Sequence, residues 1–133
     1  MERRHRVVLA GVVMLHLIVA VVHGSAHTGA AVEQGPAAMA FIFLVILAGP
    51  LLGLGWMWPN PRAGATLIGI TMAASLLFGV INHFILPGAD RVDHVAAAWR
   101  GLFESTAVLL VVTEAAGAAL GFAYGRPVVR RLT

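Results

Sequence analysis

The chain alternates long apolar stretches with short polar segments. A helix needs about 20 predominantly apolar residues to cross the hydrocarbon core of a bilayer. Four stretches meet this requirement, and they cover residues 7–24, 37–58, 64–86 and 102–124. The pattern predicts an all-α integral membrane protein, a bundle of four transmembrane helices, in which residues 1–133 form a single domain.

Turn-forming residues separate these stretches. Gly-Pro at 35–36 precedes the second stretch, Pro-Asn-Pro-Arg at 59–62 follows it, and Pro-Gly at 87–88 follows the third. Proline and glycine are frequent where helices begin and end, so we expect helix boundaries at these positions. Pro50 lies inside the second stretch, where it predicts a kink or a bend around a neighbouring helix.

The first stretch also has features of a secretory signal. Arginines at positions 3, 4 and 6 precede the apolar run, and Gly-Ser-Ala at 24–26 resembles a cleavage site. His16 interrupts the apolar run. This polar interruption favours a retained membrane helix over a signal.

Composition supports the membrane interpretation. Hydrophobic residues make up 59% of the chain and charged residues 11%, against about 25% charged in a typical soluble domain. The basic residues are all arginines, and they lie at the chain ends and in short loops, so nucleic-acid binding is not predicted. Because the chain has no cysteine, disulfides and thiolate metal centres are excluded.

The arginines also predict the orientation of the helices. Only Arg91 and Arg100 fall in the loops after the first and third stretches. The others lie at the termini and in the loop between the second and third stretches: Arg3, Arg4, Arg6, Arg62, Arg126, Arg130 and Arg131. Positive residues are retained on the cytoplasmic side, which predicts a multi-pass protein of the cytoplasmic (inner) membrane with both termini in the cytoplasm.

Small residues recur every four positions in two of the stretches. They are Gly49 and Gly53 in the second, and Gly117, Gly121 and Gly125 in and just after the fourth. Glycine lets helix backbones approach closely in lipid. The spacing favours packing within the bundle, and contacts in a homo-oligomer or a larger membrane complex are the alternative.

Histidines and acidic residues gather at the predicted extracytoplasmic side. His23 and His27 are four residues apart on one helix face, and His83 and Glu104 lie near the same level on two other helices. Imidazole and carboxylate groups suit Fe, Cu or Zn, so we predict that these four residues bind a transition metal ion. His94 is a further ligand candidate or, like Glu33 and Asp90, a catalytic acid or base. The alternatives are a metal-free network of hydrogen bonds and simple interfacial residues.

Two polar residues lie deeper in the predicted helices. Glu114 is about 15 Å inward from Glu104, and His16 is about 10 Å inward from His23. Their similar depths predict a buried His16–Glu114 pair. It would serve either as a catalytic proton path or as a structural clasp between the first and fourth helices.

Three functions remain open at this level. The first is a small metalloprotein, a redox or metal-dependent enzyme (an oxidoreductase) acting on a quinone or another small lipophilic substrate. The second is an electron-transfer protein with b-type haem between two histidines and quinol as the reductant. The third is a non-catalytic accessory subunit of a larger membrane complex.

Overall fold

The computed structural model describes residues 2–126, and over this range the secondary structure is entirely helical. The elements in chain order are α1 (Arg3–Gly29), α2 (Pro36–Phe41), the π-helix η1 (Ile42–Ala48), α3 (Gly49–Trp56), α4 (Pro61–Val80), the π-helix η2 (Ile81–Ile85), the 3₁₀-helix η3 (Val92–His94) and α5 (Ala97–Gly125). They form four continuous helical spans of 27, 21, 25 and 29 residues, each apolar and long enough to cross a membrane. The prediction of four membrane-length helices is confirmed.

Local sequence explains where two of the spans begin. Pro36 and Pro61 each occupy the first helical position, where a missing N–H costs no hydrogen bond. Asn60 caps α4, because its side-chain oxygen accepts a hydrogen bond from the N–H of Ala63 at 3.1 Å. The turn at residues 57–60 therefore separates the second and third spans where the prolines predicted.

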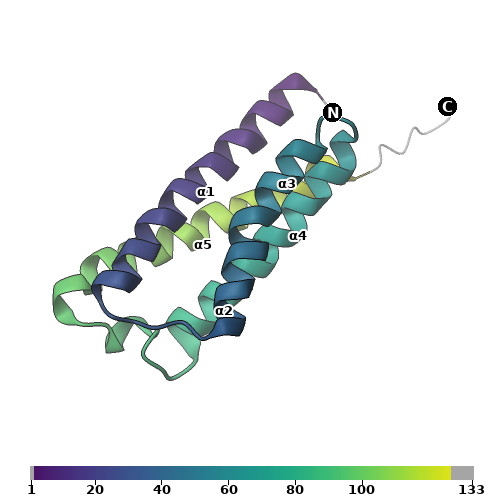
Figure 1. Ribbon diagram of the computed structural model, residues 1–133. Helices are drawn as coiled ribbons and strands as arrows, with labels where there is room; N and C mark the ends of the chain where they lie inside the picture. Colours follow the sequence, from purple (N-terminus) through teal and green to yellow (C-terminus); the bar gives the residue numbers. More distant parts are fainter. Residues whose placement is uncertain (1, 127–133) are drawn as a thin grey trace, which may run out of the picture.

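The spans pack in a definite order (Figure 1). α5 packs between α1 and α4, and α4 also packs against α3. By contrast, α1 and α3 meet at few positions. The larger buried core cluster, which includes Leu9 and Val13 of α1 and Ile68 and Met72 of α4, lies in the half of the bundle that holds the N-terminus. A smaller cluster of Ala26, Val95 and Phe103 lies at the other end.

Glycine provides the close approach of α4 and α5. A Cβ added to Gly121 would lie 2.5 Å from the backbone N of Gly69, so any side chain there would push the two backbones apart. On the second span, a Cβ on Gly49 or Gly53 would meet α4 side chains at 2.5 Å. The glycine spacing therefore serves packing inside the bundle.

Pro50 follows a π-helical segment. η1 ends at Ala48, and Pro50 is the second residue of α3. Proline cannot supply an N–H to the carbonyl of the residue four positions earlier, which here is Ile46. The wider π-turns accommodate this missing bond, which is the local distortion that Pro50 predicts.

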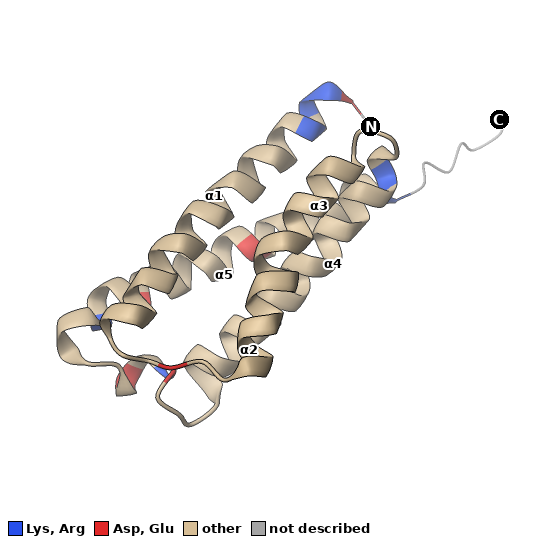
Figure 2. Ribbon diagram, viewed as in Figure 1, with Lys and Arg blue, Asp and Glu red and all other residues tan. Residues whose placement is uncertain are grey.

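Charged residues gather at the two ends of the bundle, whereas the helices between are almost free of them (Figure 2). One end carries Arg3, Arg4, Arg6 and Arg62, and is called the arginine end below. The other carries the loops 30–35 and 86–96 and is called the histidine end. Arg130 and Arg131, which also entered the orientation argument, lie outside the described residues.

Candidate metal centre

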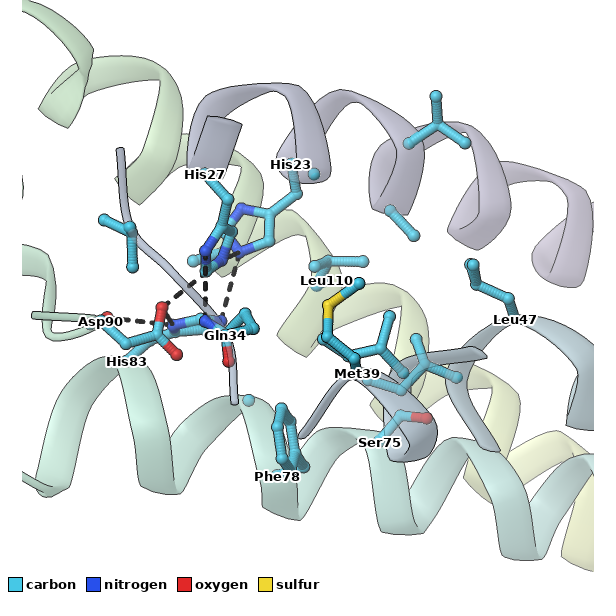
Figure 3. A pocket seen from close by; sticks show the side chains of 18 of the residues that line it. His23, His27, Gln34, Met39, Leu47, Ser75, Phe78, His83, Asp90 and Leu110 are labelled. Carbon is cyan, nitrogen blue, oxygen red and sulfur yellow. Dashed lines mark hydrogen bonds and ion pairs between the residues drawn. The ribbon is translucent and has the colours of Figure 1, made fainter. Parts of the chain in front are cut away.

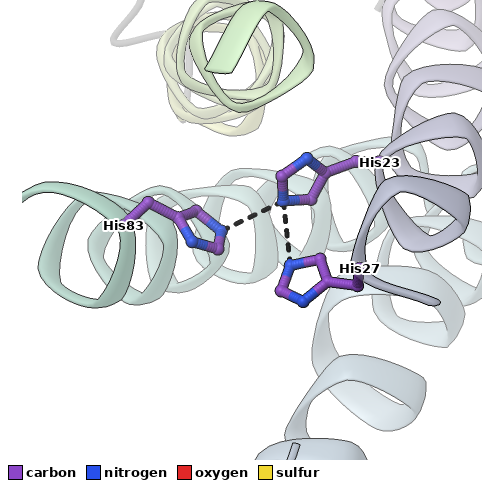
Figure 4. Close-up of side chains that lie close together, drawn as sticks. All are labelled: His23, His27 and His83. Carbon is purple, nitrogen blue, oxygen red and sulfur yellow. Dashed lines mark hydrogen bonds between the residues drawn. The ribbon is translucent and has the colours of Figure 1, made fainter. Parts of the chain in front are cut away.

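Three of the predicted ligands converge at the histidine end. His23 and His27 extend from consecutive turns of α1, and His83 extends from η2 (Figure 4). The Nε2 of His23 lies 3.2 Å from the Nε2 of His83 and 3.2 Å from the Nε2 of His27. One nitrogen from each ring falls within 4.8 Å of the others, and the group could hold a metal ion. We call these three residues the histidine triad.

Hydrogen bonds on the far side of two rings decide where their protons lie. The Nδ1 of His83 lies 3.2 Å from the backbone oxygen of Asp90, which can only accept, so Nδ1 carries the proton. The Nδ1 of His23 lies 2.8 Å from the hydroxyl oxygen of Thr106. Since that hydroxyl donates its own proton to the carbonyl of Leu102 at 2.6 Å, His23 must donate to it. Both rings in their neutral form therefore present a bare Nε2 to the centre of the triad.

This arrangement places two hydrogen-bond acceptors face to face. The Nε2 atoms of His23 and His83 are 3.2 Å apart, and neither carries a proton while both rings are neutral. Two buried lone pairs at this distance favour a proton or a metal ion between them, and a proton on the Nε2 of His27 would serve only His23.

The third histidine adjoins Gln34. The Nδ1 of His27 lies 3.3 Å from the side-chain nitrogen of Gln34. With this amide orientation His27 carries its proton on Nε2. Turning the Gln34 amide by 180° lets its oxygen accept from Nδ1 and frees Nε2 for an ion. Gln34 was not among the predicted site residues, because an amide in a loop carries no metal-site signal in the sequence.

Asp90 brings a negative charge to the triad. Its Oδ1 lies 3.3 Å from the Nδ1 of His83 and 3.4 Å from the Nε2 of His27, and this buried oxygen has no hydrogen-bond partner among the described residues. Burial raises the pKa of the Asp90 carboxyl, but contacts with His83, His27 and Gln34 outweigh it and hold the pKa below its usual value. The loop 86–96 thus supplies the carboxylate nearest to the histidines.

The other predicted residues at this end lie elsewhere. Glu104 is exposed on α5 and lines a separate shallow depression with Gly101 and Ser105, outside the histidine triad. His94 is exposed, and its Nδ1 donates to the carbonyl of Gly88 at 2.7 Å, which fastens the loop. The structure does not bring Glu104 or His94 to the triad, and Asp90 occupies the position expected for Glu104.

Two arginines hold the loop 86–96 through contacts with nearby residues of the loop. The guanidinium of Arg91 hydrogen-bonds the carboxylate of Asp93 and lowers the pKa of Asp93 to about 2. Arg100 donates to the backbone oxygens of Asp93 and Val95 at 3.1 and 3.0 Å. These contacts hold the loop that carries Asp90 against the end of the bundle.

A cavity of about 340 Å³ extends from the triad into the bundle (Figure 3). Its walls come from α1, from the second span and from the inner faces of α4 and α5. Apart from its polar ends the lining is apolar, with Met39, Leu47, Phe78 and Leu110 among the residues shown. It lies where α1 and the second span are not packed against each other.

The predicted deep pair is present. The Nδ1 of His16 lies 3.8 Å from the Oε1 of Glu114, and the exposed fractions of the two side chains are 0% and 3%. The Nε2 of His16 lies 3.1 Å from the backbone oxygen of Ile46, the carbonyl that Pro50 leaves without its α-helical donor. Glu114 also lines the cavity.

Comparison with known proteins adds no relative from which a role could be transferred. No protein-family model matches the chain, and no curated protein or solved structure matches it. The geometry of the site alone therefore supports the functional argument.

Proposed function

We propose that this protein is a multi-pass metalloprotein of the cytoplasmic membrane, in which His23, His27 and His83 bind one transition metal ion. The proposal rests on the face-to-face Nε2 atoms of His23 and His83. Two nitrogens bound to one ion at 2.0–2.1 Å in a tetrahedral site lie about 3.3–3.4 Å apart. Two of the three nitrogen separations in the triad are 3.2 Å, close to this value before any ion is added, and all three lie within 4.8 Å.

The ligand set favours Zn, Fe or Cu(II). Neutral imidazoles suit these ions, and a site with three protein ligands leaves a fourth position for water or substrate, as in catalytic rather than structural zinc sites. Asp90 adds charge beside the ligands, and Thr106 orients His23. Groups that hydrogen-bond a metal-bound histidine in this way commonly fix the orientation and the tautomer of its ring.

Haem is the weaker alternative. A porphyrin needs free space on all sides of the axis between two axial histidines. Here the Phe103 ring lies 4.8 Å from His23, 4.7 Å from His27 and 5.2 Å from His83, measured between ring centroids. Phe103 and the third histidine fill that space, so the geometry favours a bare ion.

The reaction we propose is redox or Lewis-acid chemistry on a small lipid-soluble substrate. The apolar cavity adjoins the triad and lies between α1 and the second span, which pack loosely against each other. A lipophilic molecule such as a quinone could reach the ion from the bilayer by this route. The bound ion would act on it either as a Lewis acid or as an electron carrier.

The orientation is also part of the proposal. The excess of arginine at the arginine end supports a cytoplasmic position for both termini and an extracytoplasmic position for the triad. A reporter fused after Thr133 should be cytoplasmic, and one inserted between Asp90 and Asp93 should be extracytoplasmic. A cytoplasmic reporter in the 90–93 loop would reverse the assignment.

Metal analysis combined with an absorption spectrum of the purified protein tests the metal proposal. We expect about one transition metal ion per chain and no Soret band. Single alanine substitutions of His23, His27 and His83 should each lower the metal content, because each removes a ligand.

Two substitutions serve as controls. Glu104→Ala removes an exposed carboxylate at the same end, and His5→Ala removes a histidine at the arginine end; both should leave the metal content unchanged. Full metal content in the three triad variants, or a Soret band that disappears with them, would refute the proposal of a bare ion.

A further inference from the structure

His16 has a fixed tautomer and an unused nitrogen. Its Nε2 faces the backbone oxygen of Ile46 at 3.1 Å, and because a carbonyl only accepts, Nε2 carries a proton. The Nδ1 atom is fully buried and has no hydrogen-bond partner among the described residues. This second nitrogen faces the carboxyl of Glu114.

The pair must share one further proton. A charged residue in the middle of a membrane helix costs roughly 2.5–3.5 kcal/mol, so a buried carboxylate beside a neutral imidazole is unfavourable. One added proton on Glu114 removes this cost. Both groups are then neutral, and the carboxyl group has a proton to donate.

Glu114 presents this pair to the cavity. The carboxyl group lines the cavity wall, and at 3.8 Å it is too far from His16 for a hydrogen bond. Gly79 leaves the space between the two polar ends open. A Cβ on this glycine would lie 3.9 Å from the Oε2 of Glu114 and 3.9 Å from the Cδ2 of His83. Glu114 and the ring of His83 therefore border the same small space.

We propose that His16 and Glu114 form a second binding site in this cavity, which donates a hydrogen bond to a carbonyl oxygen of a lipid-soluble quinone. The apolar walls suit a hydrophobic ring and tail, and a carbonyl oxygen is an acceptor that matches the donor at Glu114. The volume of about 340 Å³ is within the range of ligand cavities. The choice of ligand rests on the lipid-soluble substrate of the proposed function, whereas the site itself does not depend on the metal.

Binding of decylubiquinone to the full chain in lipid nanodiscs tests this site. Glu114→Leu removes the donor and should weaken binding about tenfold, the equivalent of one hydrogen bond. Glu114→Gln keeps a donor at the same place and should remain within about threefold of the wild type. Glu104→Leu is the matched control, since it removes an exposed carboxylate from the same helix, and it should not change the affinity.

The carbonyl band of the bound quinone gives a second readout. A donated hydrogen bond lowers the C=O stretching frequency, so infrared difference spectra should show a shifted band with the wild type and with Glu114→Gln. With Glu114→Leu the shift should be lost. A variant that only disturbs packing would weaken binding without moving this band.

Substitutions that fill the cavity test the site independently. Gly79→Ala adds a methyl group at ordinary contact distance and should be neutral, whereas Gly79→Leu fills the space beside Glu114 and should abolish binding. Gly11→Leu is the control, because a Cβ at Gly11 meets nothing within 4 Å.

The outcomes are distinguishable from those of the metal proposal. Each titration is performed with chelator-treated and with zinc-loaded protein. Decylbenzene, which has no oxygen to accept a hydrogen bond, is the control ligand. If the triad binds no metal but quinone binding still depends on Glu114, only the metal proposal fails. Equal affinity of wild type and Glu114→Leu for the quinone, an unshifted carbonyl band, or an equal loss of decylbenzene binding would overturn the second site.

Discussion

The hydroxyl of Thr106 should control how strongly His23 binds the metal ion, although Thr106 is not itself a ligand. It accepts the Nδ1 proton of His23 at 2.8 Å and so leaves Nε2 bare toward the triad. Thr106→Val keeps the shape of the side chain but removes the acceptor. His23 can then adopt the other tautomer, with a proton on the nitrogen that should bind the ion. Loss of such a partner typically costs 10–100-fold in metal affinity, and we expect a loss of about this size.

A threonine two turns further along α5 provides the control. Thr113 is also buried and also donates to the carbonyl four residues earlier, at 2.9 Å from Leu109. Thr113→Val therefore makes the same chemical change on the same helix, away from the triad. Affinities measured for Co(II) or Zn(II) in competition with a chelator should fall for Thr106→Val only. If the two variants bind metal equally, the tautomer argument is wrong.

Two further substitutions test the packing of the spans. Pro50→Ala supplies an N–H that can bond the Ile46 carbonyl and compete with the Nε2 of His16 for that oxygen. ¹⁵N spectra should then show a mixture of His16 tautomers. Gly121→Ala places a methyl group 2.5 Å from the backbone N of Gly69 and should lower the free energy of unfolding by about 1–3 kcal/mol, measured in detergent with increasing denaturant.

The same changes at positions without these contacts are the controls, and they should alter neither the His16 tautomer nor the free energy of unfolding. Pro36→Ala alters the first residue of α2, where the missing N–H serves no helical bond. Gly11→Ala adds a methyl group on α1 that meets nothing within 4 Å. A single His16 tautomer in Pro50→Ala, or equal stability of the two glycine variants, would contradict the corresponding argument.

Position along the axis of the bundle was predictable from the sequence, because the length of a helix per residue is fixed. Counting residues inward from the loops predicted that His16 and Glu114 lie at similar depths, and the two side chains do meet. The same counting placed His23, His27 and His83 at one level, where they converge. These predictions needed only the rise of about 1.5 Å per residue.

The direction in which each side chain points was harder to predict. A helix that is apolar on all sides offers no contrast between its lipid face and its core face. Glu104 shows the consequence. It lies ten residues from Glu114, which at about 100° per residue places the two roughly 80° apart around α5. Since Glu114 faces the cavity, Glu104 turns away from it, and this angular relation was available in the sequence.

Loop conformation explains why Asp90, which was not among the predicted metal ligands, lies beside the triad. Asp90 reaches the triad because the loop 86–96 folds back over the end of the bundle, held by hydrogen bonds from Arg100 to backbone oxygens and from His94 to Gly88. None of these bonds follows from hydropathy or from helical spacing. Thr106 was equally hidden, since a threonine in a membrane helix most often bonds its own backbone, and it does so here as well.

The unsatisfied atoms of the bundle connect its two polar sites. In lipid a buried polar group without a partner is costly, so sequences rarely retain one that has no use. Among the described residues three buried side-chain atoms lack a hydrogen-bond partner: the Nε of Arg6 near the arginine end, the Nδ1 of His16 and the Oδ1 of Asp90. The last two adjoin the same cavity, one through Glu114 and one beside the triad. A cation held by the triad would compensate the Oδ1 of Asp90. Glu114, which the Nδ1 of His16 faces, would gain an acceptor in a bound quinone.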